Sequence, residues 1–175
     1  RDEGGGHYPL HYACFNADNK RLYNAAGEDL GEEADSQEDF EACLVSQPRQ
    51  KAKWMEYIPN TGVTKEGNVF VVWEELDDMS TRDAFHTYFA VYKPEKNDWV
   101  IRHIHEDPIP VFGHLGRSHD VDVTDNGTIH LYKAAGKSMK ILRSKDSGKT
   151  WEKQTIYRAP APELESLYFV ALIDS

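Results

Sequence analysis

The chain of 175 residues is poor in cysteine, in basic residues and in long apolar runs. Two cysteines, Cys14 and Cys43, are too few for a disulfide framework. No apolar run approaches the roughly 18 residues that a membrane-spanning helix requires, so the sequence predicts no such helix. Lysine and arginine number 20 against 30 acidic residues, and the resulting net charge of −10 argues against nucleic acid as the main partner.

The residues that are present suffice for a folded core. Hydrophobic residues make up 39% of the chain and aromatic residues 11%, which argues against wholesale disorder. The length corresponds to about one domain. A mean hydropathy of −0.67 and an isoelectric point near 5.2 are typical of an acidic globular protein. Composition therefore sets the broad class, and the order of the residues has to supply the rest.

Internal similarity is the first feature of that order. Residues 63–67 (VTKEG) are similar to residues 123–127 (VTDNG), 60 positions later, and both segments run into apolar strands. Residues 22–27 (LYNAAG) are similar to residues 131–136 (LYKAAG), 109 positions later. Similarity at a fixed period indicates a repeat architecture.

The tryptophans recur at a similar spacing. Trp54, Trp99 and Trp151 each begin a β-rich run, at spacings of 45 and 52 residues. A unit of that length with four strand signals is typical of a β-propeller blade. The sequence thus predicts one propeller portion over residues 1–175, with blade units at 7–58, 59–104 and 117–157.

Each unit is expected to hold four strands, and no segment has the periodicity and caps of a helix. The expected strands are 8–15, 21–26, 40–46 and 53–58, then 60–64, 68–74, 86–92 and 99–104, then 119–123, 128–134, 139–144 and 151–157. Hairpin turns are expected at 18–19, 66–67 and 126–127, where Asp, Asn and Gly accept turn geometry. Residues 163–175 carry the start of a further strand. Three blades leave sheet faces uncovered, so we expect remaining blades or other copies of the chain to close the propeller.

The sharpest local motif is the segment 144–151, SKDSGKTW, which matches the pattern S-x-D-x-G-x-T-W. Its five specified residues are Ser144, Asp146, Gly148, Thr150 and Trp151. We expect a tight hairpin in which Asp146 accepts hydrogen bonds across the loop, Gly148 supplies a positive φ and Trp151 covers the core. The equivalent hairpins before Trp54 and Trp99 retain the tryptophan and lose most of the motif.

With this motif the chain resembles the BNR/Asp-box propellers, a group that includes sialidases, other glycosidases and some polysaccharide lyases. Residues 88–92 (YFAVY) and 99–102 (WVIR) resemble its seven-bladed branch of ulvan lyases and rhamnose–glucuronate enzymes. The resemblance implies an all-β propeller, an oligo- or polysaccharide partner and a secreted, periplasmic or extracellular location. It also implies that the Asp-box lies on the face opposite the substrate, so that Asp146 is structural.

In a propeller, the loops that join a fourth strand to the next first strand share one face with the loops between second and third strands. Two such connections are rich in imidazole and guanidinium groups. The candidate catalytic residues there are His119, Arg117, Tyr8 and His7. An imidazole or a phenol can remove the proton α to a uronate carboxyl, and an arginine can bind that carboxylate through two hydrogen bonds.

Further residues of these connections are candidates for substrate binding, namely His114, His105, Asp120 and His11. Structural alternatives stand beside them. His103, on a strand next to Arg102, is expected to pack at a blade interface, and His105 is alternatively a solvated loop residue. His130 alternates with apolar residues in a strand and is expected to be structural.

No histidine or cysteine spacing in the sequence is typical of a compact zinc site, so no metal or cofactor is predicted. Eight acids fall between residues 28 and 41, and no lysine or arginine occurs between Arg21 and Arg49. The segment is expected to be a solvated insertion, with calcium binding or repulsion of the wrong ligand as the alternative, although its spacing is not that of an EF-hand. Cys14 and Cys43 are expected two ladder steps apart, too far for a disulfide, and hence free and buried.

These patterns lead to one hypothesis about function and two alternatives. The leading hypothesis is a carbohydrate-active enzyme, a polysaccharide lyase or glycoside hydrolase, that acts on a glycan containing uronic acid. The first alternative is a glycan-binding or scaffold propeller without catalysis, because a fold does not fix a function. The second is a sialidase-type exo-glycosidase, whose arginine triad would have to come from Arg102, Arg117, Arg143 and Arg158.

Overall fold

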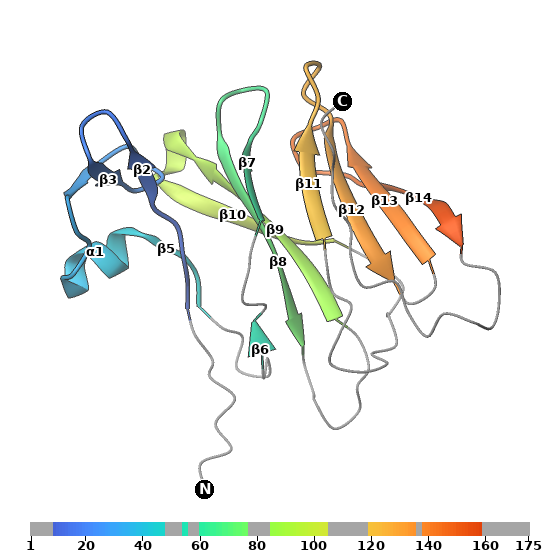
Figure 1. Cartoon of the computed structure of the whole chain (residues 1–175), viewed down its shortest axis with the longest axis horizontal. Coiled ribbons are helices and arrows are strands. Elements are labelled where there is room, and N and C mark those ends of the chain that lie inside the picture. The colour runs from blue at the N-terminus through green and yellow to red at the C-terminus, as the bar shows by residue number, and fades with distance from the viewer. Residues whose placement is uncertain are drawn as a thin grey trace, which may run out of the picture.

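The computed structural model describes residues 9–47, 54–55, 60–76, 85–104, 119–135 and 138–158. Regular structure in these ranges is almost entirely β, arranged in four antiparallel sheets (Figure 1). A six-residue α-helix and a short 3-10 turn are the other regular elements of the described part. The prediction of an all-β chain is confirmed at this level, with one short helix added.

Two of the sheets contain a four-strand antiparallel meander, to which β6 (Trp54–Met55) adds a fifth strand in one of them. The middle sheet contains β7 (Asn60–Val63), β8 (Val69–Leu76), β9 (Phe85–Lys93) and β10 (Asp98–Ile104), in that spatial order. The C-terminal sheet contains β11 (His119–Val123), β12 (Ile129–Ala135), β13 (Ser138–Ser144) and β14 (Glu152–Arg158). All eight strands lie within one or two residues of their predicted positions.

The described strands of residues 9–47 and 54–55 do not pair as the expected four-stranded unit. In the described part, β1 (Leu10–His11) pairs with β5 (Leu44–Ser46), whereas β2 (Cys14–Asn16), β3 (Arg21–Tyr23) and β4 (Asp29–Gly31) form a separate sheet. β6 (Trp54–Met55), expected to close this unit, pairs with the far end of β8 in the middle sheet. The strands are only two or three residues long, and register breaks at Leu10/His11 and Leu22/Tyr23 interrupt the ladders.

The expected strand at 40–46 is instead helix α1 (Gln37–Ala42) followed by β5. Ser36 caps the helix: its hydroxyl accepts a hydrogen bond from the Asp39 backbone N–H at 3.1 Å, and the Asp39 carboxylate accepts one from the Ser36 N–H at 3.2 Å. This reciprocal pair satisfies two N–H groups that the first helical turn leaves without partners. A helix of six residues is too short to show periodicity, so the cap was the one signal for it in the sequence.

The middle sheet is buried on both faces, which explains its continuous apolar run at 69–73. Phe70 and Val72 pack with Ile129 and Leu131 of the C-terminal sheet. Their neighbours on β8 point to the opposite face, where they pack against residues of β1 and β5, the cluster being Leu10, Val45, Val71, Trp73, Tyr88 and Ala90. Successive sheets are therefore stacked face to face, with the strand period of two dividing each strand between two cores.

Three turns repeat one hydrogen-bonding pattern, at residues 24–28, 64–68 and 124–128. In each, the first N–H donates to the last carbonyl, at 3.1, 2.8 and 3.0 Å respectively. Each has a glycine of positive φ at its fourth position, Gly27, Gly67 and Gly127. This pattern aligns β3–β4 with β7–β8 and β11–β12. It corrects the second sequence similarity, because Leu22 precedes its turn whereas Leu131 follows the equivalent one.

The hairpin between β13 and β14 is organised around Asp146. One carboxylate oxygen accepts hydrogen bonds from the Ser144 hydroxyl at 2.9 Å and the Thr150 backbone N–H at 2.8 Å, and the other accepts from the Thr150 hydroxyl at 2.6 Å. The Ser144 hydroxyl in turn accepts from the Gly148 N–H at 2.8 Å. A further bond joins this hairpin to the middle sheet, because the Ser147 hydroxyl donates to Glu66 at 2.7 Å.

Asp146 makes part of the stability of the folded chain dependent on pH. Burial alone would raise its pKa, but hydrogen bonds from Thr150, Ser144 and Lys149 outweigh this effect and lower the pKa from 3.8 to about 2. A carboxyl with a depressed pKa in the folded state contributes stability above its unfolded pKa, and this stability is lost as pH falls through the folded value. We expect the stability difference between wild type and Asp146→Asn, measured by urea unfolding, to shrink as the pH falls from about 4 toward about 2. A difference that stays constant over this interval would contradict the assignment.

Gly148 is constrained twice, by a φ of +78° and by the Phe89 ring, which would lie 2.1 Å from an added Cβ. Gly67 has a similar φ of +83° but nothing within 4 Å. We expect Gly148→Ala to lower the free energy of unfolding by about 3 kcal/mol, from left-handed strain and overpacking together. Gly67→Ala, the matched control, should cost about 1 kcal/mol from strain alone. Urea unfolding followed by tryptophan fluorescence measures the free energy of unfolding of both variants. Equal losses would show that the contact with Phe89 adds nothing to the cost of Gly148→Ala.

Candidate functional site

The middle and C-terminal sheets share a loop end, defined here as the end at which β8, β10 and β12 finish and β9 and β11 begin. The arrowheads of β8 and β12 point toward it in the lower half of Figure 1. The opposite, hairpin end carries the turns at 64–68 and 124–128 and the β13–β14 hairpin. Residues 74–76, 85–88, 102–104 and 119–120 therefore lie close to the loop end.

Two histidines meet at the loop end of the middle sheet. His86 at the start of β9 and His103 near the end of β10 place Nδ1 of the first 3.1 Å from Nε2 of the second. Their ring centroids are 5.0 Å apart. His103 is exposed and His86 is half-buried. The strand register brings them together, since His103 lies directly opposite Tyr88 and thus diagonal to His86.

An aromatic stack supports this imidazole pair. The His103 ring lies 5.2 Å from the Tyr88 ring, and Tyr88 stacks on Trp73 at 5.4 Å. Trp73 is 1% exposed, and its indole N–H donates to Glu75 at 2.9 Å. Because buried rings of this size have few alternative rotamers, the stack holds the exposed imidazole in a fixed position.

The opposite face of the same strands carries a buried ion pair. The Lys133 ammonium on β12 lies 2.5 Å from the Glu74 carboxylate on β8, and their side chains are 2% and 4% exposed. The same ammonium donates to the Thr87 hydroxyl on β9. Lys133 thus joins the C-terminal sheet to the middle sheet immediately behind the imidazole pair.

The arrangement is suited to proton transfer. Imidazole titrates near neutral pH, so one side-chain type can serve as general base or general acid. In a hydrogen bond between two imidazoles, one ring donates and the other accepts, so a proton taken up by one nitrogen can be passed to the other. The exposure of His103 leaves this pair open to a ligand at the loop end.

No family model matches the chain, and no curated protein matches it. Among the described residues, no helix is long and apolar enough to cross a membrane.

Three of the eight predicted catalytic and substrate-binding residues lie in the described part. His119 begins β11 at the loop end, where its Cα partner is Lys133. Asp120 follows it, half-buried, and accepts a hydrogen bond from the Val121 N–H at 2.9 Å. His11 on β1 is exposed and packs edge-on against Phe40, with ring centroids 5.8 Å apart. The other candidates lie outside the described residues: His7, Tyr8, His105, His114 and Arg117.

His103 packs on the Tyr88 ring and shares a hydrogen bond with His86, but it stays exposed. Arg102, not His103, turns toward the C-terminal sheet, on the face that carries Val100 and Ile104. One Arg102 guanidinium nitrogen, Nη1, is buried without a hydrogen-bond partner among the described residues. This leaves His103 on the other face, exposed and beside His86.

His130 lies away from the imidazole pair, on the outer face of the C-terminal sheet. It is half-buried, with Nδ1 3.9 Å from the Asp122 carboxylate. Burial and the nearby Arg143 lower its pKa, and Asp122 opposes them. Arg143 donates to Gln154 at 2.6 Å on the same face, so it does not join Arg102 in a sialidase-like arginine cluster.

The acidic segment 28–41 is solvated, since seven of its eight acids are exposed, and it also contains β4 and α1. Asp29 forms an ion pair with Arg21 at 2.6 Å. Across the described ranges, no group of three or more His, Cys, Asp or Glu residues is placed to hold a metal ion, so the geometry gives no support to calcium there. Both cysteines are free, but Cys14 is exposed, contrary to expectation, and Cys43 is buried.

The sequence interpretation missed His86, Tyr88, Glu74, Thr87 and Lys133. A signal for the first two was available, because the short turn at 94–97 fixes the β9–β10 register and hence the partners of His103. The Lys133–Glu74 pair had no such signal, since its two residues belong to different sheets and are 59 positions apart in sequence.

Proposed function

We propose that the chain is part of a β-propeller that binds a glycan containing uronic acid at the loop end and cleaves it as a polysaccharide lyase, with glycoside hydrolysis as the second possibility. The remaining blades, or other copies of the chain, would complete the propeller. The imidazole pair of His86 and His103, stacked on Tyr88, is the observation that carries the proposal.

The fold supports the propeller part of the proposal in three ways. Two sheets contain four-strand antiparallel meanders, β7–β10 and β11–β14, and four such strands are the composition of a blade. Successive sheets stack face to face through two apolar clusters. The turns at 24–28, 64–68 and 124–128 repeat one bonding pattern, as expected of units descended from one blade.

The site supports elimination at a uronate. The base takes the proton from the carbon α to the carboxyl, and the electron pair of that C–H bond forms a carbon–carbon double bond. The bond from the neighbouring carbon to the glycosidic oxygen then breaks, and this oxygen leaves with the electron pair and receives a proton from the acid. An imidazole pair, with the Tyr88 phenol beside it, offers both a base and an acid for these steps.

The described residues support hydrolysis by a pair of carboxylates less well than they support elimination. Glu74 and Glu75 are 3% and 1% exposed. Glu74 is held by Lys133, and Glu75 accepts from the Trp73 indole. A glycosidase needs two carboxyl groups that reach the scissile bond. Lys133 is likewise engaged, so neutralisation of the substrate carboxylate is assigned to Arg117, as the sequence predicts.

The decisive experiment incubates the chain with a panel of uronic-acid polysaccharides and follows the ultraviolet absorbance of an unsaturated uronate. The proposal predicts that this product accumulates. Carboxyl-reduced versions of the same polysaccharides are the matched control, and they should not react because the α proton is no longer acidic.

Other products would replace the proposal with one of its alternatives. New reducing ends without unsaturation would indicate hydrolysis. Saturable binding of oligosaccharide without any turnover would indicate a glycan-binding propeller. Release of sialic acid from a reporter substrate would indicate the sialidase alternative.

A further inference from the structure

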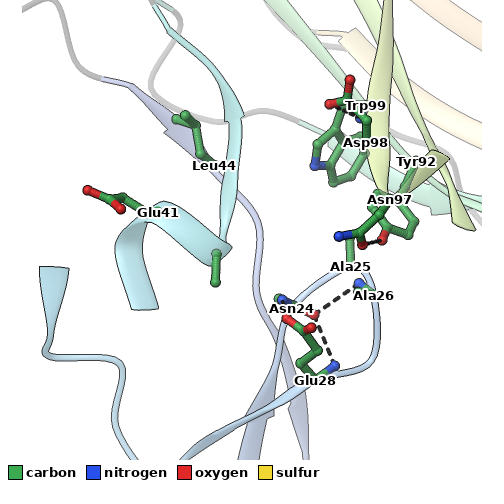
Figure 2. Close-up of a pocket in the computed structure, with 11 residues that line it drawn as sticks. Asn24, Ala25, Ala26, Glu28, Glu41, Leu44, Tyr92, Asn97, Asp98 and Trp99 are labelled. Carbon is green, nitrogen blue, oxygen red and sulfur yellow. Dashed lines mark hydrogen bonds between the residues drawn. The ribbon is translucent and has the colours of Figure 1, made fainter. Parts of the chain in front are cut away.

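A second concave site lies at the hairpin end, remote from the imidazole pair. It is a cavity of about 310 Å³ between the turn at 24–28, the end of α1 with the start of β5, and the β9–β10 hairpin. Figure 2 shows the three segments around one opening, with Asn24 and Glu28 on one side, Tyr92, Asn97 and Trp99 on another, and Leu44 on the third. The volume is that of a site for a small molecule.

The walls combine apolar surface with acidic groups. Ala25, Ala42, Leu44 and the Trp99 indole supply the apolar part. Glu28, Glu41 and Asp98 supply three carboxylates, and the eleven lining residues include no lysine, arginine or histidine. Figure 2 shows that the Glu41 carboxylate points away from the β9–β10 side, whereas Glu28 lies beside Asn24. The Asp98 carboxylate accepts a hydrogen bond from the Trp99 N–H at 2.7 Å.

Hydrogen bonds hold the polar wall in place. The Asn24 side chain accepts from the N–H groups of Ala26 and Glu28, both at 3.0 Å, and donates to the Glu28 carboxylate at 2.6 Å. On the other side, the Tyr92 hydroxyl donates to Asn97 at 2.6 Å. Burial raises the pKa of Tyr92, and the negative charges of Glu28 and Asp98 raise it further.

We propose that this cavity binds a small organic cation, an amine whose ammonium group lies against Glu28 and whose carbon body lies against Trp99 and Leu44. A carboxylate stabilises an ammonium by charge and hydrogen bonds, and aromatic rings add a cation–π attraction. The acidic segment 28–41 excludes anions from the same opening. The inference does not depend on the proposed glycan activity, which belongs to the opposite end of the sheets.

The test compares three probes of one shape and different charge: glucosamine, glucose and glucuronate. Each is titrated into the isotope-labelled chain, and NMR shifts of the amides of residues 24–28 and 97–99 and of the Trp99 indole N–H are followed. We expect glucosamine to shift these signals saturably and to bind about tenfold tighter than glucose, with glucuronate weaker still. Added salt should weaken glucosamine binding.

Two variants assign the effect to the cavity. Glu28→Gln keeps an acceptor for Asn24 and should lower glucosamine affinity about tenfold. Glu33→Gln, an exposed acid of the same segment outside the cavity, should leave it unchanged. Equal binding of glucose and glucosamine would overturn the assignment to a cation. Absence of saturable shifts in the folded wild-type chain would overturn the site itself.

Discussion

Replacing Lys133 by alanine is expected to lower the free energy of unfolding by about 3–5 kcal/mol, the range found when one partner of a buried ion pair is removed. The substitution leaves the Glu74 carboxylate, 3% exposed, without its cation, and it also leaves the space of a long side chain between two sheets. Urea unfolding measured by circular dichroism gives the change.

Two comparisons identify the cause of the expected loss. Lys145→Ala, an exposed lysine in the β13–β14 hairpin, should change stability by less than about 0.5 kcal/mol. The double variant Lys133→Met with Glu74→Met removes both charges and fills most of the volume, so it should recover much of the stability. If Lys133→Ala behaved like Lys145→Ala, the ion pair would have no role in joining the sheets.

Loss of the imidazole pair is expected to have the largest effect on activity. His86→Ala and His103→Ala should each lower the rate of elimination by about 10²–10⁴-fold, the usual contribution of a general acid or base. The double variant should be little worse than either single variant, because the two rings act as one hydrogen-bonded unit. Rates are measured from the absorbance of the unsaturated product.

His130→Ala is the matched control, because it removes a histidine from the same pair of sheets on a different face. It should retain the wild-type rate. Tyr88→Phe separates two roles of the tyrosine: if only its ring matters, as support for His103, the rate should be nearly unchanged. Wild-type rates in both His86→Ala and His103→Ala would remove this pair from the mechanism.

The strands of residues 59–157 could be predicted because local signals agree there with tertiary packing. Gly67 and Gly127 mark two turns, and the apolar run at 69–73 reflects burial on both faces of the middle sheet. The hydrogen bonds of Asp146 likewise follow from a motif whose residues are all close in sequence. Such features need no knowledge of distant parts of the chain.

The strands of residues 7–58 were harder to predict from the sequence, because they are short and do not pair in sequential order. β1 pairs with β5 across 33 residues, and β6 joins a different sheet from the one expected. Helix α1 is specified mainly by the Ser36 capping box, a signal that the strong β pattern around it obscured. In this part, tertiary context decides between structures that local propensity leaves nearly equal.

Neither His86 nor His103 was predicted as a site residue from the sequence, and five of the eight predicted catalytic and substrate-binding residues lie outside the described part. The loop end follows from strand order, and histidines were expected there. Which of two neighbouring residues, Arg102 or His103, faces the adjacent sheet depends on the register of β10, and a shift of one residue exchanges the two faces. The Lys133–Glu74 contact depends on how two sheets stack, which no local pattern specifies.

The most direct test of the account is an NMR titration of the histidine rings with a uronic-acid oligosaccharide, because it reports binding at the loop end whether or not cleavage follows. The account predicts that the ring signals of His86 and His103 shift together and saturably while those of His130 stay in place. The carboxyl-reduced oligosaccharide should produce much smaller shifts. Unchanged signals of His86 and His103 at saturating oligosaccharide, or shifts confined to His130, would contradict a glycan site at the loop end.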